Sequence, residues 1–121
     1  KKNRAIQSRL EKVLSYTKQT MVAYMSEEDL NRLCAYIVEY SSGDTLQKIS
    51  PVKVDSQLKS IDIMHFGWNI GKAFNKKRIH TATFIKNVFA HTLRDVEIST
   101  IERKMSHTES ETKIHLNNQL V

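Results

Sequence analysis

The feature that most constrains the fold of this chain is a pair of glycines, Gly67 and Gly71, inside a strong helical pattern. Apolar residues recur at three- and four-residue spacing over about 61–75, which predicts a helix there. A glycine inside a helix costs roughly 1 kcal/mol relative to alanine. We therefore expect another helix to pack closely against this pair and to offset that cost. The predicted apolar face comprises Ile63, Phe66, Gly67, Ile70 and Phe74.

The other face of this helix carries His65, Asn69 and Lys72, which we expect to point outward. Polar side chains of this kind disfavour a lipid environment, so the Gly-x-x-x-Gly spacing indicates soluble packing rather than a membrane dimer. Trp68 lies off the main apolar stripe. We expect it to pack against the N-terminal part of the chain rather than to stack on a ligand.

Two further helices are predicted before this one, over about 4–25 and about 27–41. Ser26 is placed to cap the second helix, and Gly43 to end it. Because almost no loop separates them, we expect an antiparallel hairpin. Its expected core positions in the second helix are Leu30, Leu33, Cys34, Ile37 and Val38.

After a basic turn at 75–80, Thr81 is predicted to cap a fourth helix over about 82–93. A short fifth helix is expected to follow, capped by Asp95 or Ser99. The segment 44–59 has mixed periodicity and is compatible with a short strand or with a linker. A brief alternation at 113–116 permits one short strand near the C-terminus, in an otherwise polar tail.

These patterns predict a single, mostly all-α domain. It would combine an N-terminal helical hairpin with a C-terminal three-helix unit that resembles a helix-turn-helix in architecture. The expected parts are residues 1–43 (hairpin), 44–59 (connector), 60–107 (three-helix unit) and 108–121 (polar tail). Because the chain starts at Lys1 rather than at methionine, we expect it to be a piece of a longer protein.

Catalysis is poorly supported by the sequence. The histidines form no pair at metal-ligand spacing, and no glycine-rich phosphate loop or pair of catalytic carboxylates is visible. We therefore expect no enzyme activity, no metal, no cofactor and no small-molecule substrate. The single cysteine, Cys34, excludes an internal disulfide and favours a reducing, cytoplasmic location. No apolar run is long enough to span a membrane.

The charge distribution points to an anionic partner. The chain has a formal net charge of +6 and a sequence pI near 9.5, and residues 63–94 contain no carboxylate. The leading hypothesis is a non-enzymatic regulatory or accessory protein, for example in transcription, that binds nucleic acid, with DNA favoured over RNA. The residues predicted to contact it are Lys72, Lys76, Lys77, Arg78, Lys86, Arg94, Ser99, Thr100, Arg103 and Lys104.

Two other expectations accompany this hypothesis. The alternative function is a helical adaptor, or a subdomain of a larger protein, with an acidic protein partner. The apolar stripe over residues 4–25 is longer than the second helix needs, which predicts a homodimer through the first helix.

Overall fold

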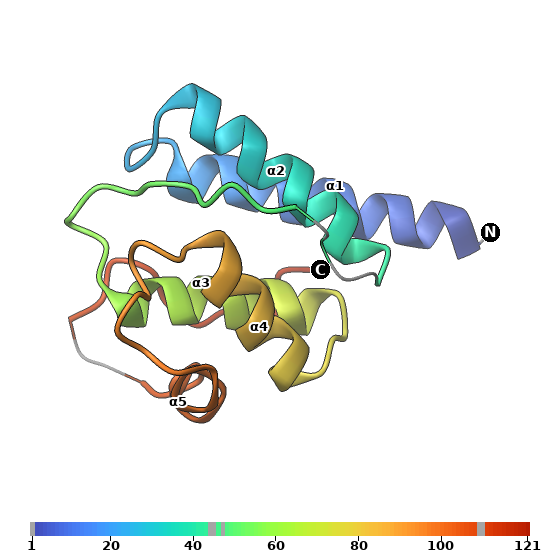
Figure 1. The fold of residues 1–121 in the computed structure, drawn as a ribbon. Helices are drawn as coiled ribbons and strands as arrows, with labels where there is room; N and C mark the ends of the chain where they lie inside the picture. Colours follow the sequence, from blue (N-terminus) through green and yellow to red (C-terminus); the bar gives the residue numbers. More distant parts are fainter. Residues whose placement is uncertain (1, 44–45, 47, 109–110) are drawn as a thin grey trace.

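The computed structural model describes residues 2–43, 46, 48–108 and 111–121. Within these ranges the chain forms helices and no strand, which confirms the predicted all-helical class. The helices are α1 (Lys2–Met21), α2 (Glu27–Ser41), α3 (Ser60–Ala73), α4 (Arg78–Val88) and α5 (Ile98–Lys104). The α1–α2 hairpin forms one layer, and α3 and α4 lie beneath it with α5 at the far side (Figure 1). The possible short strands at 44–59 and 113–116 are not formed in the described parts of those segments.

The hairpin forms largely as the sequence predicts. Ser26 Oγ accepts a hydrogen bond from the Asp29 N–H at 3.1 Å, and Gly43 follows α2 with a φ of +93°, a backbone conformation that favours glycine. The first helix ends at Met21 rather than near residue 25. Val38 was expected in the core, but its side chain is 41% exposed.

Residues 48–59 of the connector between α2 and α3 run along the hairpin without forming a strand (Figure 1). Arg32 holds it in place by donating to Ser50 O (3.0 Å) and Pro51 O (2.9 Å). The Val52 N–H donates to Val88 O at 2.9 Å, at the end of α4. Backbone groups of the connector are thus paired with the Arg32 side chain and with a carbonyl at the end of α4, in place of the neighbouring strand of a sheet.

The predicted close approach at the two glycines is confirmed, and the neighbour is α4. A Cβ added to Gly67 would lie 2.7 Å from Ile85 Cγ2, and one on Gly71 would overlap Thr81 Oγ1 and lie 2.9 Å from Thr81 Cγ2. Both distances are below normal van der Waals contact. The absence of a side chain at these positions is what lets α3 and α4 pack at this distance.

The start of α4 differs from the prediction. The helix begins at Arg78 with Lys77 as its N-cap, so the expected cap Thr81 lies inside the first turns and is 2% exposed. The Thr81 hydroxyl is 2.7 Å from Tyr40 Oη and donates to Lys77 O at 3.2 Å. Burial against Gly71 explains this placement, because it requires a small residue within the helix. The α5 cap is also different: Glu97 occupies the position, rather than Asp95 or Ser99.

The polar face of α3 is the largest departure from the sequence prediction. His65 and Asn69 are 2% and 0% exposed, and Asp62 beside them is 2% exposed. The C-terminal segment covers all three side chains, so the expectation that His65 and Asn69 face outward is wrong. Lys72, one turn further along α3, is exposed as predicted.

Hydrogen bonds to the backbone hold this segment on α3. Asp62 Oδ1 accepts the N–H groups of Lys113 (2.7 Å) and Ile114 (3.1 Å). His65 Nδ1 lies 2.8 Å from Ile114 O, and its Nε2 lies 2.6 Å from His107 O. Both partners are carbonyl oxygens, which only accept, so a ring nitrogen makes either hydrogen bond as the donor.

Asn69 joins the segment to the hairpin. Its Nδ2 donates to Tyr16 Oη and to His115 O, both at 2.8 Å, and its Oδ1 accepts the Asn117 N–H at 2.6 Å. The tail that the sequence predicted only to be polar is therefore a packed part of the domain over these residues. Ile114 is correspondingly buried.

None of the helices in the described ranges combines the length and the apolar character required to cross a membrane.

Candidate nucleic-acid interface

The end of α3, the following turn and the start of α4 bring several cations to one corner of the domain. The turn covers residues 74–77, which is the short kind found in helix-turn-helix pairs, rather than the longer 75–80 turn expected from the sequence. Asn75 makes it possible by adopting a φ of +57°, a conformation that asparagine tolerates better than most residues. Lys72 and Lys77 are exposed on either side of this turn, and Lys76 is half-buried.

Arg78 connects this corner to α5. Its guanidinium donates to Glu102 O and, at 3.1 Å, to Ser106 Oγ. Because Glu102 O lies near the end of α5, this contact places the last turn of α5, with exposed Arg103 and Lys104, beside the start of α4. We use the name "basic corner" for Lys72, Lys76, Lys77, Arg78, Arg103 and Lys104.

A small pocket of about 140 Å³ lies within the basic corner. Its described lining includes Lys72, Lys76 and Arg78 but no carboxylate. Trp68 forms part of the wall, with Lys72 Nζ 6.0 Å from its ring centroid, at the limit of a cation–π contact. Trp68 therefore faces the cations and α5 at this pocket, whereas the sequence predicted packing against the hairpin. The four-residue spacing of Trp68 and Lys72 was the signal that could have indicated this pairing. The described lining residues are Trp68, Gly71, Lys72, Asn75, Lys76, Arg78, Thr81 and Met105.

Four of the predicted contact residues lie outside the basic corner. Lys86 Nζ donates to the backbone oxygens of Leu93 (2.7 Å), Arg94 (3.2 Å) and Val96 (2.7 Å), so its three N–H groups already hold the loop after α4. This geometry does not support a phosphate contact for Lys86.

The remaining three lie near the loop before α5 and its first turn. Arg94 and Ser99 are exposed, and Thr100 is half-buried beside Asp95 and Glu97. Lys104 of the basic corner lines the same pocket, so these acids lie near that lysine as well, and they would repel a phosphate from Thr100. We therefore leave Arg94, Ser99 and Thr100 out of the basic corner.

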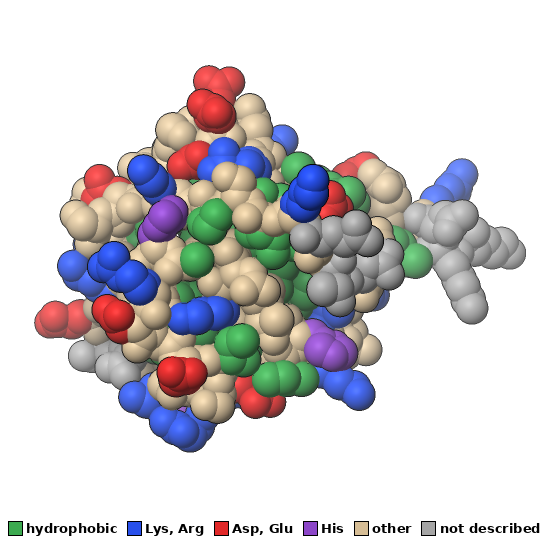
Figure 2. Space-filling view, in the orientation of Figure 1, with side chains coloured by type: hydrophobic (Ala, Val, Ile, Leu, Met, Phe, Trp, Pro, Cys, Tyr) green, Lys and Arg blue, Asp and Glu red, His purple; other side chains and the backbone are tan. Residues whose placement is uncertain are grey.

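A view of one face shows why location matters more than net charge. Lys and Arg side chains on this face stand apart, with Asp and Glu side chains among them and hydrophobic side chains between (Figure 2). Such a mixed surface is ordinary for a soluble protein. The argument for an anionic partner therefore rests on the basic corner rather than on the overall charge.

Two other groups bear on possible chemistry. Burial raises the pKa of the Cys34 thiol, against a smaller opposing effect of the Lys18 charge, which disfavours a reactive thiolate. Cys34 is only half-buried, although it was expected on the core face. Among the residues that the structure describes, no three His, Cys, Asp or Glu side chains gather in a way that could hold a metal ion.

Comparisons of the chain with protein-family models, with curated proteins and with solved structures found no significant match.

Proposed function

We propose that this protein binds nucleic acid, and duplex DNA in particular, through the basic corner. The observation that carries the proposal is a pocket lined by Lys72 near the end of α3, Lys76 in the turn and Arg78 at the start of α4, with no carboxylate among its described lining residues. Lys and Arg side chains in such an arrangement neutralise phosphates and release counterions. The revised contact set is Lys72, Lys76, Lys77, Arg78, Arg103 and Lys104.

The α3–α4 pair supports duplex DNA over RNA. A short turn joins the two helices, and α4 begins at the basic corner with exposed Arg78, Ile79 and His80. The exposed first turn of a helix can enter the major groove of B-DNA, whereas the major groove of A-form RNA is too deep and narrow for side chains to enter. We assign α4 to the groove in place of the first turn of α5, because Ser99 and Thr100 lie beside acids.

The test compares two triple variants that lose the same charge. Lys72→Gln/Lys76→Gln/Lys77→Gln removes cations from the basic corner, and Lys53→Gln/Lys59→Gln/Lys113→Gln removes three exposed lysines from elsewhere. Arg78 is left intact because its contacts with α5 would confound binding with folding. Binding to a mixed-sequence duplex is followed by fluorescence anisotropy at several salt concentrations.

The basic-corner variant should bind more weakly, and its log–log salt slope should fall by up to about 3, near 0.9 per lost phosphate contact. The control variant should keep most of the slope. Equal losses in the two variants would mean that only net charge matters, and an affinity independent of salt would favour the adaptor function. Tighter binding to duplex RNA would overturn the choice of DNA.

The homodimer and the cytoplasmic location that the sequence suggested remain predictions. Exposed apolar surface on α1 supports a homodimer through residues 4–25, because Ile6 is 55% exposed and the first turns of α1 extend beyond α2 (Figure 1). Sedimentation at tens of micromolar protein would test it. We also propose a cytoplasmic location, which the single cysteine supports.

A further inference from the structure

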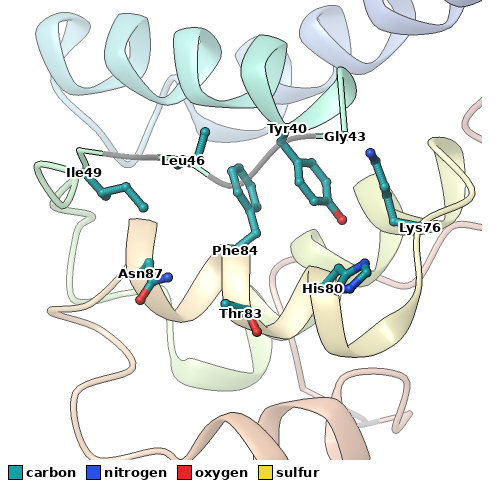
Figure 3. A pocket seen from close by; sticks show the side chains of 9 residues that line it. All are labelled: Tyr40, Gly43, Leu46, Ile49, Lys76, His80, Thr83, Phe84 and Asn87. Carbon is teal, nitrogen blue, oxygen red and sulfur yellow. The ribbon is translucent and has the colours of Figure 1, made fainter.

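A second cavity, of about 200 Å³, lies on the other side of Lys76 from the pocket of the basic corner. Its lining comes from the end of α2, the connector, the α3–α4 turn and one face of α4 (Figure 3). The described lining residues are Tyr40, Gly43, Leu46, Ile49, Lys76, His80, Thr83, Phe84 and Asn87. This cavity plays no part in the proposed phosphate contacts, apart from the shared Lys76.

The cavity has an apolar side. Phe84 stacks on Tyr40 with ring centroids 4.2 Å apart, and both side chains are 5% exposed, so they form a fixed aromatic floor. Leu46 and Ile49 from the connector add aliphatic surface next to Phe84 (Figure 3). A planar apolar group is the ligand feature that such a surface favours.

The cavity also has a cationic end. Lys76 Nζ lies 5.2 Å from the Tyr40 ring centroid, and an added Cβ on Gly43 would be 3.4 Å from it, so the glycine leaves room for the ammonium group. None of the described residues that line the cavity is a carboxylate. His80, Thr83 and Asn87 follow one another along α4 on the same side and supply polar groups beside the aromatic floor (Figure 3).

We propose that this cavity binds a small monocyclic aromatic carboxylate, with its ring against Phe84 and Leu46 and its carboxylate on Lys76. The volume agrees with this ligand class, because an engineered apolar cavity of about 150 Å³ accommodates benzene. A cavity of about 200 Å³ has room for one ring and a carboxylate.

Occupancy would also regulate the basic corner, a step that rests on the proposed function. A carboxylate paired with Lys76 withdraws that cation from a phosphate, and the bound ring occupies the face of α4 beside the groove-facing turn. The ligand and DNA should therefore weaken each other's binding by the same factor, about fivefold or more.

The first experiment measures ligand binding alone by NMR, with benzoate as the probe. Benzamide has the same ring without the charge, and acetate has the charge without the ring. Benzoate should shift the signals of Phe84, Ile49 and the Lys76 side chain, and should bind about tenfold or more tightly than either control. Equal binding of benzamide, no shifts with benzoate, or shifts elsewhere on the domain would overturn the site.

Variants then locate the charge contact. Lys76→Met should weaken benzoate about tenfold and leave benzamide unchanged, whereas Lys77→Met, at the exposed neighbouring position, should change neither. Thr83→Trp places a ring in the cavity and should abolish binding of both probes. A Thr83→Trp variant that is folded and still binds benzoate in the same place would contradict the proposal, even if Lys76→Met proves unstable.

The second experiment repeats the duplex titration with saturating benzoate. DNA affinity should fall in the wild-type protein and stay constant in Thr83→Trp. Unchanged DNA affinity at full benzoate occupancy would overturn the regulatory step while leaving the ligand site in place. A protein that binds benzoate but no nucleic acid would instead refute the proposed function and the regulation together.

Discussion

The side of α3 that meets α4 lacks side chains at two positions, whereas the opposite side carries three polar side chains that are fully paired. The first side is buried by close packing, because Gly67 and Gly71 let Ile85 and Thr81 of α4 approach. The second side is buried beneath the C-terminal segment, whose backbone groups form hydrogen bonds with Asp62, His65 and Asn69. The two sides are buried to a similar degree by different physical means. Overpacking should disrupt the first side, and loss of a hydrogen-bond partner should disrupt the second.

The largest effect is expected at Gly71. Gly71→Leu should lower the free energy of unfolding by about 3 kcal/mol, because the new side chain collides with Thr81, whose position is fixed by Tyr40. Urea denaturation measures the change, with Lys72→Leu at the exposed neighbouring position as the control. If Gly71→Leu proved as stable as the control, α4 could not lie as close to α3 as described.

A smaller and more local effect is expected at Asn69. Asn69→Leu keeps the approximate volume but leaves Tyr16 Oη, His115 O and the Asn117 N–H without their partner, which should cost about 2 kcal/mol. Hydrogen exchange should show faster exchange at Asn117, with α4 still protected. Asn87→Leu, on the exposed side of α4, is the matched control. Uniformly faster exchange over the domain would show that this side is not a separate unit.

The smallest effects are expected at two tyrosines, one for each side of α3. Tyr40 pairs with Thr81 beside Gly71, and Tyr16 pairs with Asn69. At neutral pH, Tyr40→Phe and Tyr16→Phe should each cost about 1 kcal/mol, since each removes one buried hydrogen bond. Tyr24→Phe, at a half-buried position, provides the comparison.

The contribution of Tyr40 to stability should depend on pH in the alkaline range. Burial raises the pKa of Tyr40 to about 12 despite the opposing hydrogen bond to Thr81, so the folded protein holds this proton more tightly than the unfolded chain does. Its contribution to stability should be complete below the unfolded value of about 10 and should be lost as the pH rises toward 12. The free energy of unfolding, measured at several pH values across this range, should fall less steeply with pH in Tyr40→Phe than in the wild-type protein. Identical slopes for wild type and variant would rule out this linkage.

The side of α3 that faces α4 could be predicted from the sequence because its signal is local. The glycine spacing and the apolar periodicity lie within a few turns of helix, and they require a close neighbour wherever that neighbour comes from. Ser26 and Gly43 were predictable for the same reason, since a cap depends on residues next to it in the chain. Thr81 has the right chemistry for a cap, but packing against Gly71 placed it inside α4 instead.

The polar side could not be predicted because its partners are distant in sequence and are mainly backbone groups. His65 pairs with carbonyl oxygens 42 and 49 residues away, and no side-chain pattern in the tail marks those atoms. The candidate site shows the same division. The run Lys76–Arg78 was identified from its lack of nearby acids, but the use of Lys86 and Arg78 to bind backbone oxygens depends on where the loops fold back.

The contacts of Asn69 also have a consequence for the order of folding. They bring together segments separated by 46, 48 and 53 residues, whereas α1 and α2 meet across a short turn. Because long loops must be closed before such contacts form, we expect the C-terminal segment to dock after the transition state has been crossed. Changes at Asn69 should then accelerate unfolding and leave the refolding rate almost unaltered. The lifetime of the native state, more than the speed of reaching it, would depend on this one amide side chain.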